Sequence, residues 1–161
     1  MGAVPVALTR TSEKRQALLD AGAAHVIATA EEDLLTEVNR ITEGKGARMA
    51  FDPVGGAEVA KILRSLFPLG IFFQYGALET GDMSIPVMEV LGKNLTIRGY
   101  QLFDVTENAE RLNRAKAFIT KGLEAGALHP LIAKTFPLHQ IVEAHQFMES
   151  NAQIGKIVIE I

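Results

Sequence analysis

The pattern of apolar and polar residues changes repeatedly along the chain, between short apolar runs and stretches in which apolar residues recur every three or four positions. Short, mostly apolar runs such as Val4–Leu8 and His25–Ile27 have the length of buried strands. Between these runs, apolar residues recur every three or four positions, as Leu34, Val38 and Ile41 do, which indicates helices with one buried face. Strands that alternate with helices predict an α/β fold with a parallel, doubly wound sheet.

The same pattern predicts where each element lies. The expected strands are Val4–Leu8, His25–Ile27, Met49–Phe51, Ile71–Tyr75, Leu95–Arg98, Lys134–Phe136 and Gly155–Ile161. The expected helices begin at Ser12, at Leu34, at Val59 (including Leu66 and ending at Gly70), at Val87, at Thr106 (a long helix to Ala125) and at Gln140. Because the character of the pattern changes over the last 35 residues, the C-terminal segment need not belong to the main parallel sheet.

Composition and charge narrow the range of partners. The chain has 161 residues, 48% of them hydrophobic, and a net charge of −3, so it offers no basic surface for nucleic acid or an anionic membrane. It has no apolar run long enough to span a bilayer, and Met1-Gly2-Ala3 does not open a signal peptide. Cysteine is absent, which excludes disulfides, thiol nucleophiles and cysteine zinc sites. We therefore expect a soluble, cytoplasmic protein.

The end of the first strand carries a cluster of cationic and hydroxyl side chains. Dinucleotide-binding folds usually place an acid at the end of the second sheet strand, where it binds the 2′-hydroxyl of NAD. Here the strand is followed by Arg10, Thr11, Ser12 and Lys14 instead. The cations can neutralise a 2′-phosphate, and a hydroxyl can donate to it. The alternative is that Ser12 is an ordinary N-cap and Lys14 a solvated helix residue.

Further candidate contacts lie in loops that follow the later strands. Asp52–Gly56, Gly76–Leu78 and Gly99–Leu102 each follow a predicted strand. In open parallel sheets the carboxyl ends of the strands share one edge, where ligands bind. The paired Gly55 and Gly56 would allow backbone to approach a ligand, although an ordinary tight turn is the alternative.

The sequence shows no motif for a glycine-rich phosphate loop, a metal site or a catalytic group. The chain contains no G-x-G-x-x-G motif and no Walker-type phosphate loop. The histidines, at positions 25, 129, 139 and 145, show no metal-ligand spacing, so no metal site is expected. Glu31 and Glu32 have the pattern of a solvated helix start, where the helix dipole favours negative charge. No residue can be assigned a catalytic role.

In their order along the chain, these segments resemble the medium-chain dehydrogenase/reductase family, particularly quinone oxidoreductases and zinc-type alcohol dehydrogenase-like members. The matching stretches are VPVALTRTSEKRQALLDAGAAHVI, GKGARMAFDPVGG, GKNLTIRGYQ and HQIVEAHQFMESNAQIGKIVIEI. The resemblance implies a partial nucleotide-binding Rossmann domain over residues 1–126. Residues 127–161 would then be a returning segment of a GroES-like substrate domain.

The resemblance also implies contacts with a cofactor. Arg10, Thr11 and Lys14 would hold a 2′-phosphate, which favours NADPH, and Val54 and Gly55 would line its ribose side. The remaining implied contacts are Gly76 and Ala77 with the central stretch of the cofactor, Tyr100 and Leu102 with the nicotinamide carboxamide, and Asn151 and Lys156 with the phosphates.

Compared with members of that family, this chain is expected to lack the first strand and its glycine motif, which would lie in the middle of the sheet. Most of the substrate domain is also missing. With the family order 3-2-1-4-5-6, two half-sheets with unpaired inner edges are expected. Such a C-terminal fragment would form a homodimer or pair with a missing N-terminal portion. The last strand, Gly155–Ile161, is also expected to lack its partner, and strand 95–99 to pair across a two-fold axis.

Three functions remain open from the sequence. The first is an NADPH-dependent oxidoreductase that transfers hydride to a quinone, enone or carbonyl substrate, with this chain as the cofactor-side portion and inactive by itself. The second is a non-catalytic module that dimerises or binds a nucleotide weakly. The third, another doubly wound enzyme such as a nucleoside-cofactor methyltransferase, is disfavoured because Arg10 and Lys14 suit a phosphate better than a neutral ribose.

Overall fold

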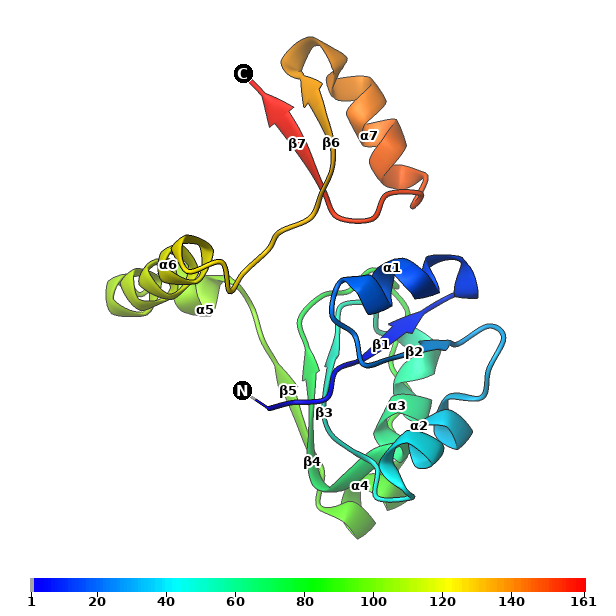
Figure 1. Ribbon diagram of the computed structural model, residues 1–161. Helices are drawn as coiled ribbons and strands as arrows, with labels where there is room; N and C mark the ends of the chain where they lie inside the picture. The colour runs from blue at the N-terminus through cyan, green and yellow to red at the C-terminus, as the bar shows by residue number, and fades with distance from the viewer. Residues whose placement is uncertain (1) are drawn as a thin grey trace. The chain divides into compact units, whose positions relative to one another are not determined.

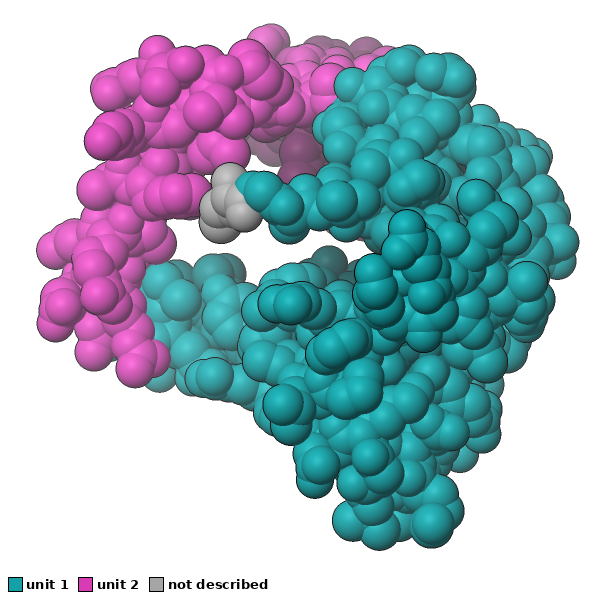
Figure 2. Space-filling view, turned by 60° about the horizontal axis from the view of Figure 1, so that its bottom comes forward, with its two compact units in different colours: residues 1–107 teal, residues 108–161 magenta. Residues whose placement is uncertain are grey.

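A computed structural model describes residues 2–161 (Figure 1). The chain forms two compact units, residues 1–107 and 108–161, which Figure 2 shows in different colours. Within the part of the chain that is described, no helix is both long and apolar enough to cross a bilayer.

The first unit alternates strands and helices in the predicted order. Its strands are β1 (Val6–Thr9), β2 (His25–Ala28), β3 (Ala47–Asp52), β4 (Leu66–Gln74) and β5 (Thr96–Gly99). Its α-helices are α1 (Arg15–Asp20), α2 (Leu34–Thr42), α3 (Val59–Arg64), α4 (Val87–Lys93) and α5 (Phe103–Thr106), with short 3₁₀ turns η1 (Ser12–Lys14) and η2 (Gly56–Glu58). The predicted strand–helix alternation is therefore confirmed, and all strand pairs are parallel.

The strands form two separate sheets, as the sequence predicted. One sheet has the order β1-β2 and the other β3-β4-β5. Val6 lies opposite His25 and Thr9 opposite Ala28 in the first sheet. Within residues 2–161, β1 and β3 each have one paired neighbour, so each keeps an open edge.

The backbone groups on these open edges can be identified from the bonds on the opposite side. The carbonyls of Pro5 and Thr9 accept from the β2 side, from the N–H groups of Ala24 (2.9 Å) and Thr29 (2.8 Å). Since successive residues of a strand direct their backbone groups to alternate neighbours, Val6 and Leu8 present theirs to the open edge of β1. The side chain of Leu8 is 43% exposed there, as expected for an apolar residue without an adjoining strand.

One apolar cluster joins both sheets to the same layer of helices. Its buried members are Ile27, Leu34, Val38, Val59, Ile62, Leu63, Leu66 and Phe72. They come from β2 and β4 and from α2 and α3, and Val6 and Ala50 of the two open-edged strands pack against them. In Figure 1, α2, α3 and α4 lie together beside the strands. The helix layer therefore connects the two sheets through apolar packing.

The boundary between α3 and β4 differs from the prediction. Leu66 continues the helical spacing of Val59, Ile62 and Leu63, yet it is the first residue of β4, opposite Ala47. The helix ends at Arg64, and its C-cap residue Ser65 donates its hydroxyl to the carbonyl of Ile62 at 2.8 Å. Gly70 lies within the strand. A buried apolar residue fits both the helical and the strand spacing, so periodicity could not show whether Leu66 belongs to α3 or to β4.

The second unit contains α6 (Ala109–Glu124), β6 (Ile132–Pro137), the turn η3 (Leu138–Gln140), α7 (Ile141–Glu149) and β7 (Lys156–Glu160). β6 and β7 form their own parallel sheet, which confirms that the C-terminal segment stands apart from the other sheets. The expectation that the closing strand lacks a partner in this chain was wrong, because the β6–α7–β7 connection brings β6 beside it.

The predicted long helix from Thr106 to Ala125 corresponds to α6, which begins later than expected. α5 ends at Thr106 and α6 begins at Ala109. Asn108 has an extended backbone, and its Oδ1 accepts from the backbone N–H of Arg111 at 3.0 Å, which is an N-cap. The compact units divide at this cap. The proposed division by function, 1–126 and 127–161, stays a prediction.

Candidate functional site

The loop after β3 is held by a buried carboxylate. Asp52 is 6% exposed, and its two oxygens accept from the backbone N–H groups of Val54 (2.9 Å) and Gly55 (3.0 Å). Gly55 has φ +84° and ψ −153°, a conformation that residues with a Cβ rarely adopt. Two of the predicted cofactor contacts, Val54 and Gly55, therefore have a defined backbone conformation.

The loop after β4 is bonded to the loop after β3. The N–H of Leu78 donates to the carbonyl of Pro53 (3.1 Å) and that of Glu79 to the carbonyl of Val54 (2.9 Å). The backbones meet at Gly76, where an added Cβ would lie 2.6 Å from the carbonyl oxygen of Pro53. A side chain at this position would force the two loops apart.

A hollow of about 240 Å³ opens between these loops. Its lining residues are Gly55, Gln74, Gly76, Ala77, Glu79, Thr80, Gly81, Asp82 and Met83. Gln74 Nε2 donates to the carbonyl of Gly76 at 2.6 Å, whereas Gln74 Oε1 is buried and accepts from no group in the described chain. The hollow is thus lined by the predicted residues Gly55, Gly76 and Ala77 and by Gln74, whose amide oxygen has no hydrogen-bond partner in the described chain.

The loop after β5 joins the same edge of the sheet. The N–H of Tyr100 donates to the carbonyl of Gln74 at 2.9 Å. The side chains of Tyr100 and Leu102 are 45% and 66% exposed. The three strands of this sheet therefore place their predicted contact loops next to one another.

The predicted phosphate-binding residues follow β1, in the other sheet. The side chain of Arg10 is exposed, while Thr11 and Lys14 are half-buried. Thr11, and not Ser12, is the N-cap of η1, and its side chain makes no capping bond. The interpretation of Ser12 as an N-cap was therefore wrong.

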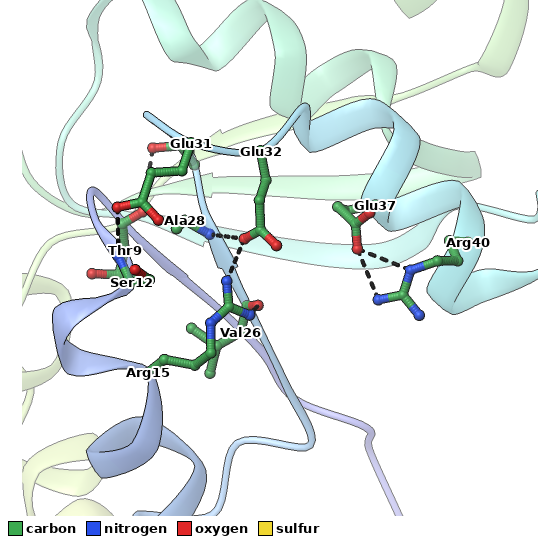
Figure 3. Close-up of polar contacts among 10 residues, drawn as sticks. Thr9, Ser12, Arg15, Val26, Ala28, Glu31, Glu32, Glu37 and Arg40 are labelled. Atoms are coloured by element: carbon green, nitrogen blue, oxygen red, sulfur yellow. Dashed lines mark hydrogen bonds and ion pairs between the residues drawn. The ribbon is translucent and has the colours of Figure 1, made fainter.

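Two acids from the loop after β2 bind this junction (Figure 3). Glu31 Oε1 accepts from the backbone N–H of Ser12 at 3.0 Å. Glu32 Oε2 accepts from Arg15 Nη2 at 2.6 Å and from the backbone N–H of Ala28 at 2.7 Å. The expectation that these acids form a solvated helix start was wrong. α2 begins after them, with Asp33 as its N-cap.

The hydrogen bonds change the acidity of both carboxyl groups. The pKa of Glu31 lies below its usual value because the backbone N–H and then the side chain of Ser12 donate to the carboxylate. The pKa of Glu32 is lowered by the N–H of Ala28 and then by the Arg15 guanidinium. Both groups are therefore ionised at neutral pH.

The last two predicted contacts, Asn151 and Lys156, belong to the second unit. Asn151 has a left-handed backbone, with φ +54°, after the end of α7. Lys156 opens β7, and its N–H donates to the carbonyl of Leu131 at 2.7 Å. Their approach to cofactor phosphates stays a prediction.

No cluster of three or more histidine, cysteine, aspartate or glutamate residues that could hold an ion occurs in residues 2–161.

Parallel strands with glycine-bearing loops gathered at their carboxyl ends define an α/β fold, and open parallel sheets bind ligands at this edge. Residues 21–159 match the family of zinc-binding dehydrogenases. The chain belongs to this family and, with it, to the medium-chain dehydrogenases/reductases that the sequence resembles.

Individual relatives are reductases. The chain is 31% identical to 2-haloacrylate reductase from a Burkholderia species over 99% of this chain and 48% of that protein. It is 27% identical to quinone oxidoreductase 1 of Escherichia coli strain K12, over 99% of this chain and 50% of that one.

Solved structures give the same result. The crystal structure of 2-haloacrylate reductase superposes with a TM-score of 0.86 over 98% of this chain and 50% of that chain, at 31% identity. Escherichia coli quinone oxidoreductase complexed with NADPH superposes with a TM-score of 0.84 over 96% and 48%, at 26% identity. The chain thus spans about half the length of the relatives it matches.

Proposed function

We propose that this chain forms the cofactor-side half of an NADPH-dependent reductase that acts on a quinone, an enone or a carbonyl compound. The observation that carries the proposal is the joined set of loops after β3, β4 and β5, with Gly55 and Gly76 of the first two loops against one hollow. The relatives support it, because one of them is a quinone oxidoreductase complexed with NADPH. A cytoplasmic location stays a prediction from the sequence.

The charges at the two parts of the site suit different parts of NADPH. Glu79 and Asp82 line the hollow, and carboxylates there favour ribose hydroxyls over phosphates. Gln74 Oε1 can accept from a hydroxyl or a carboxamide N–H. Arg10 and Lys14 carry positive charge at the end of β1, which suits a 2′-phosphate.

NADPH, when bound, supplies the hydride. The residues of this chain would bind and orient it, with Asp52 holding the Val54–Gly55 backbone in place. Tyr100 and Leu102 would cover the nicotinamide side and exclude water. We assign no residue of this chain a proton-transfer role.

Binding measurements test the cofactor assignment. The chain is titrated with NADPH and with NADH while nicotinamide fluorescence is followed. Arg10→Ala or Lys14→Ala should raise the Kd for NADPH about 5- to 150-fold, equivalent to about 1–3 kcal/mol for each lost charge-assisted contact. The Kd for NADH should change little.

Lys45→Ala is the matched control, because it removes one positive charge from a surface lysine paired with Glu43. It should leave both Kd values unchanged. An equal loss of NADH and NADPH affinity in the Arg10 and Lys14 variants would contradict the proposal.

A second candidate function is favoured by the open edges of β1 and β3. Unpaired strand edges bind other strands, so the chain would act as a non-catalytic module that pairs with a second copy or with another polypeptide. Light scattering distinguishes the two. A dimer of the 17.4 kDa chain without nucleotide binding would favour the module, and a chain that binds NADPH would favour the reductase half.

A further inference from the structure

The loop after β2 lies beside the proposed 2′-phosphate site because β1 and β2 are paired in register. Thr9 is opposite Ala28, and the bonding continues past both strands. The N–H of Thr29 donates to the carbonyl of Thr9 at 2.8 Å, and the N–H of Ala30 to that of Arg10 at 3.0 Å. The next residue along this loop is Glu31.

The carboxylate of Glu31 contacts the same segment that is proposed to bind the phosphate. Its Oε1 accepts from the backbone N–H of Ser12 at 3.0 Å, and Figure 3 shows the side chain reaching across from the loop to Ser12. A phosphate that took this N–H as a donor would displace the carboxylate, and any phosphate beside it would meet a like charge.

Glu31 has a different bonding partner from the two acids that follow it. Glu32 is bonded to Arg15 and to the N–H of Ala28, and it stabilises the junction itself. Asp33 caps α2 by accepting from the N–H of Thr36 at 2.9 Å. Glu31 therefore brings a negative charge to the Arg10–Lys14 segment from the neighbouring strand.

We propose that Glu31 is a specificity-determining residue that opposes a 2′-phosphate and favours a 2′-hydroxyl at this junction. In dinucleotide-binding folds an acid at this end of the sheet accepts from the ribose 2′-hydroxyl. No acid follows β1 directly, and Glu31 supplies one from the loop after β2. The inference rests on the proposed function, since it concerns the choice between NADPH and NADH. The charge of Glu31 offsets part of the attraction that Arg10 and Lys14 exert on the phosphate.

The test uses two adenosine probes that differ in the 2′-phosphate, 2′,5′-ADP and 5′-AMP. Their binding to the full chain, to Glu31→Gln and to Glu43→Gln is measured by calorimetry. Glutamine keeps an oxygen that can accept from Ser12, so the substitution removes charge and preserves the contact. Glu43 pairs with Lys45 in another loop and controls for the change in net charge.

Glu31→Gln should bind 2′,5′-ADP about two- to tenfold more tightly than the unmodified chain does, with no gain for 5′-AMP. The gain should shrink as salt is raised, because the charges are exposed. An unchanged affinity for 2′,5′-ADP, or an equal gain in Glu43→Gln, would overturn the inference.

The same data separate this inference from the cofactor proposal. If the unmodified chain prefers 5′-AMP and Glu31→Gln gains only 2′,5′-ADP, the NADPH preference fails and the role of Glu31 stands. If the unmodified chain prefers 2′,5′-ADP and Glu31→Gln is no different, the role of Glu31 fails by itself. If neither probe binds to any of the proteins, both fail.

Discussion

The two units bury apolar side chains to very different extents. In the first unit the cluster around Phe72 and Leu63, both 0% exposed, joins two sheets to one helix layer. In the second unit the buried apolar residues are Phe136 and Ala144, each 3% exposed. Helix α6 of that unit has no buried residue. The first unit therefore contains a core of its own, whereas α6 has an apolar face that its own unit leaves uncovered.

Within the first unit, the two faces of the β3-β4-β5 sheet differ in how far their side chains are buried. On the face of β3 that packs against the core cluster, Ala50 is half-buried. On the other face, Met49 and Phe51 are 57% and 64% exposed, although the ring of Phe51 stacks on Phe73 at a centroid distance of 4.9 Å. One face of the β3-β4-β5 sheet is thus covered by helices, whereas the other exposes large apolar side chains.

The largest effect is expected from removing the central ring of the core. Phe72→Ala should lower the free energy of unfolding by about 3–5 kcal/mol, because it removes a fully buried aromatic side chain and leaves a cavity. Urea unfolding followed by circular dichroism measures the change. Phe118→Ala, at 62% exposure on α6, is the matched control and should cost less than about 0.5 kcal/mol. Equal costs would mean that α6 is buried in solution and would remove the contrast between the units.

A smaller effect is expected at the buried carboxylate of the site. Asp52→Ala leaves the N–H groups of Val54 and Gly55 without an acceptor and should cost about 1–3 kcal/mol in the same unfolding assay. Asp52→Asn keeps one acceptor oxygen and should cost less. Asp20→Ala, an exposed acid bonded to Gln16, should cost a few tenths of a kcal/mol. A cost at Asp52 no greater than at Asp20 would show that the loop is not held by this carboxylate.

The smallest effect is a pH dependence from the loop after β2. The folded-state pKa values of Glu31, Glu32 and Asp33 lie below their ordinary values of 4.5, 4.5 and 3.8. Their stabilising contribution is therefore complete above those ordinary values and is lost as the pH falls through the lowered, folded-state values.

Glu32→Gln should reduce the steepness with which stability falls on acidification, while Glu43→Gln should not. Unfolding curves collected between neutral pH and about pH 2 measure this. If stability rose on acidification over this range, the direction assigned to these three groups would be wrong.

Part of the fold could be read from periodicity, and the errors occurred where one residue satisfies two patterns. The strand–helix order and the break between the sheets were predicted. Leu66 was assigned to a helix because it is apolar at helical spacing, and it is buried in either structure. The start of α6 was placed too early, at Thr106, although Asn108 carries an N-cap signal.

The site was predicted less completely than the fold. The residues after β3, β4 and β5 could be proposed because the ends of parallel strands meet at one edge. The role of Glu31 depends on a contact between two loops, and no local pattern signals it. Asp52 and Gln74, in contrast, bond to backbone groups two or three residues further along the chain. Adjacent acids before a helix also have a common solvated arrangement, which is why Glu31 and Glu32 were misread.

The sequence by itself determined the class of fold, the order of the elements and the family, because these follow from local periodicity and from residues in a fixed order along the chain. The tertiary structure alone decided that β6 pairs with β7, which face of each sheet is covered and which carboxylate reaches Ser12. These features depend on contacts between residues far apart in the chain, whose geometry is set by packing and hydrogen bonding rather than by the spacing of neighbours.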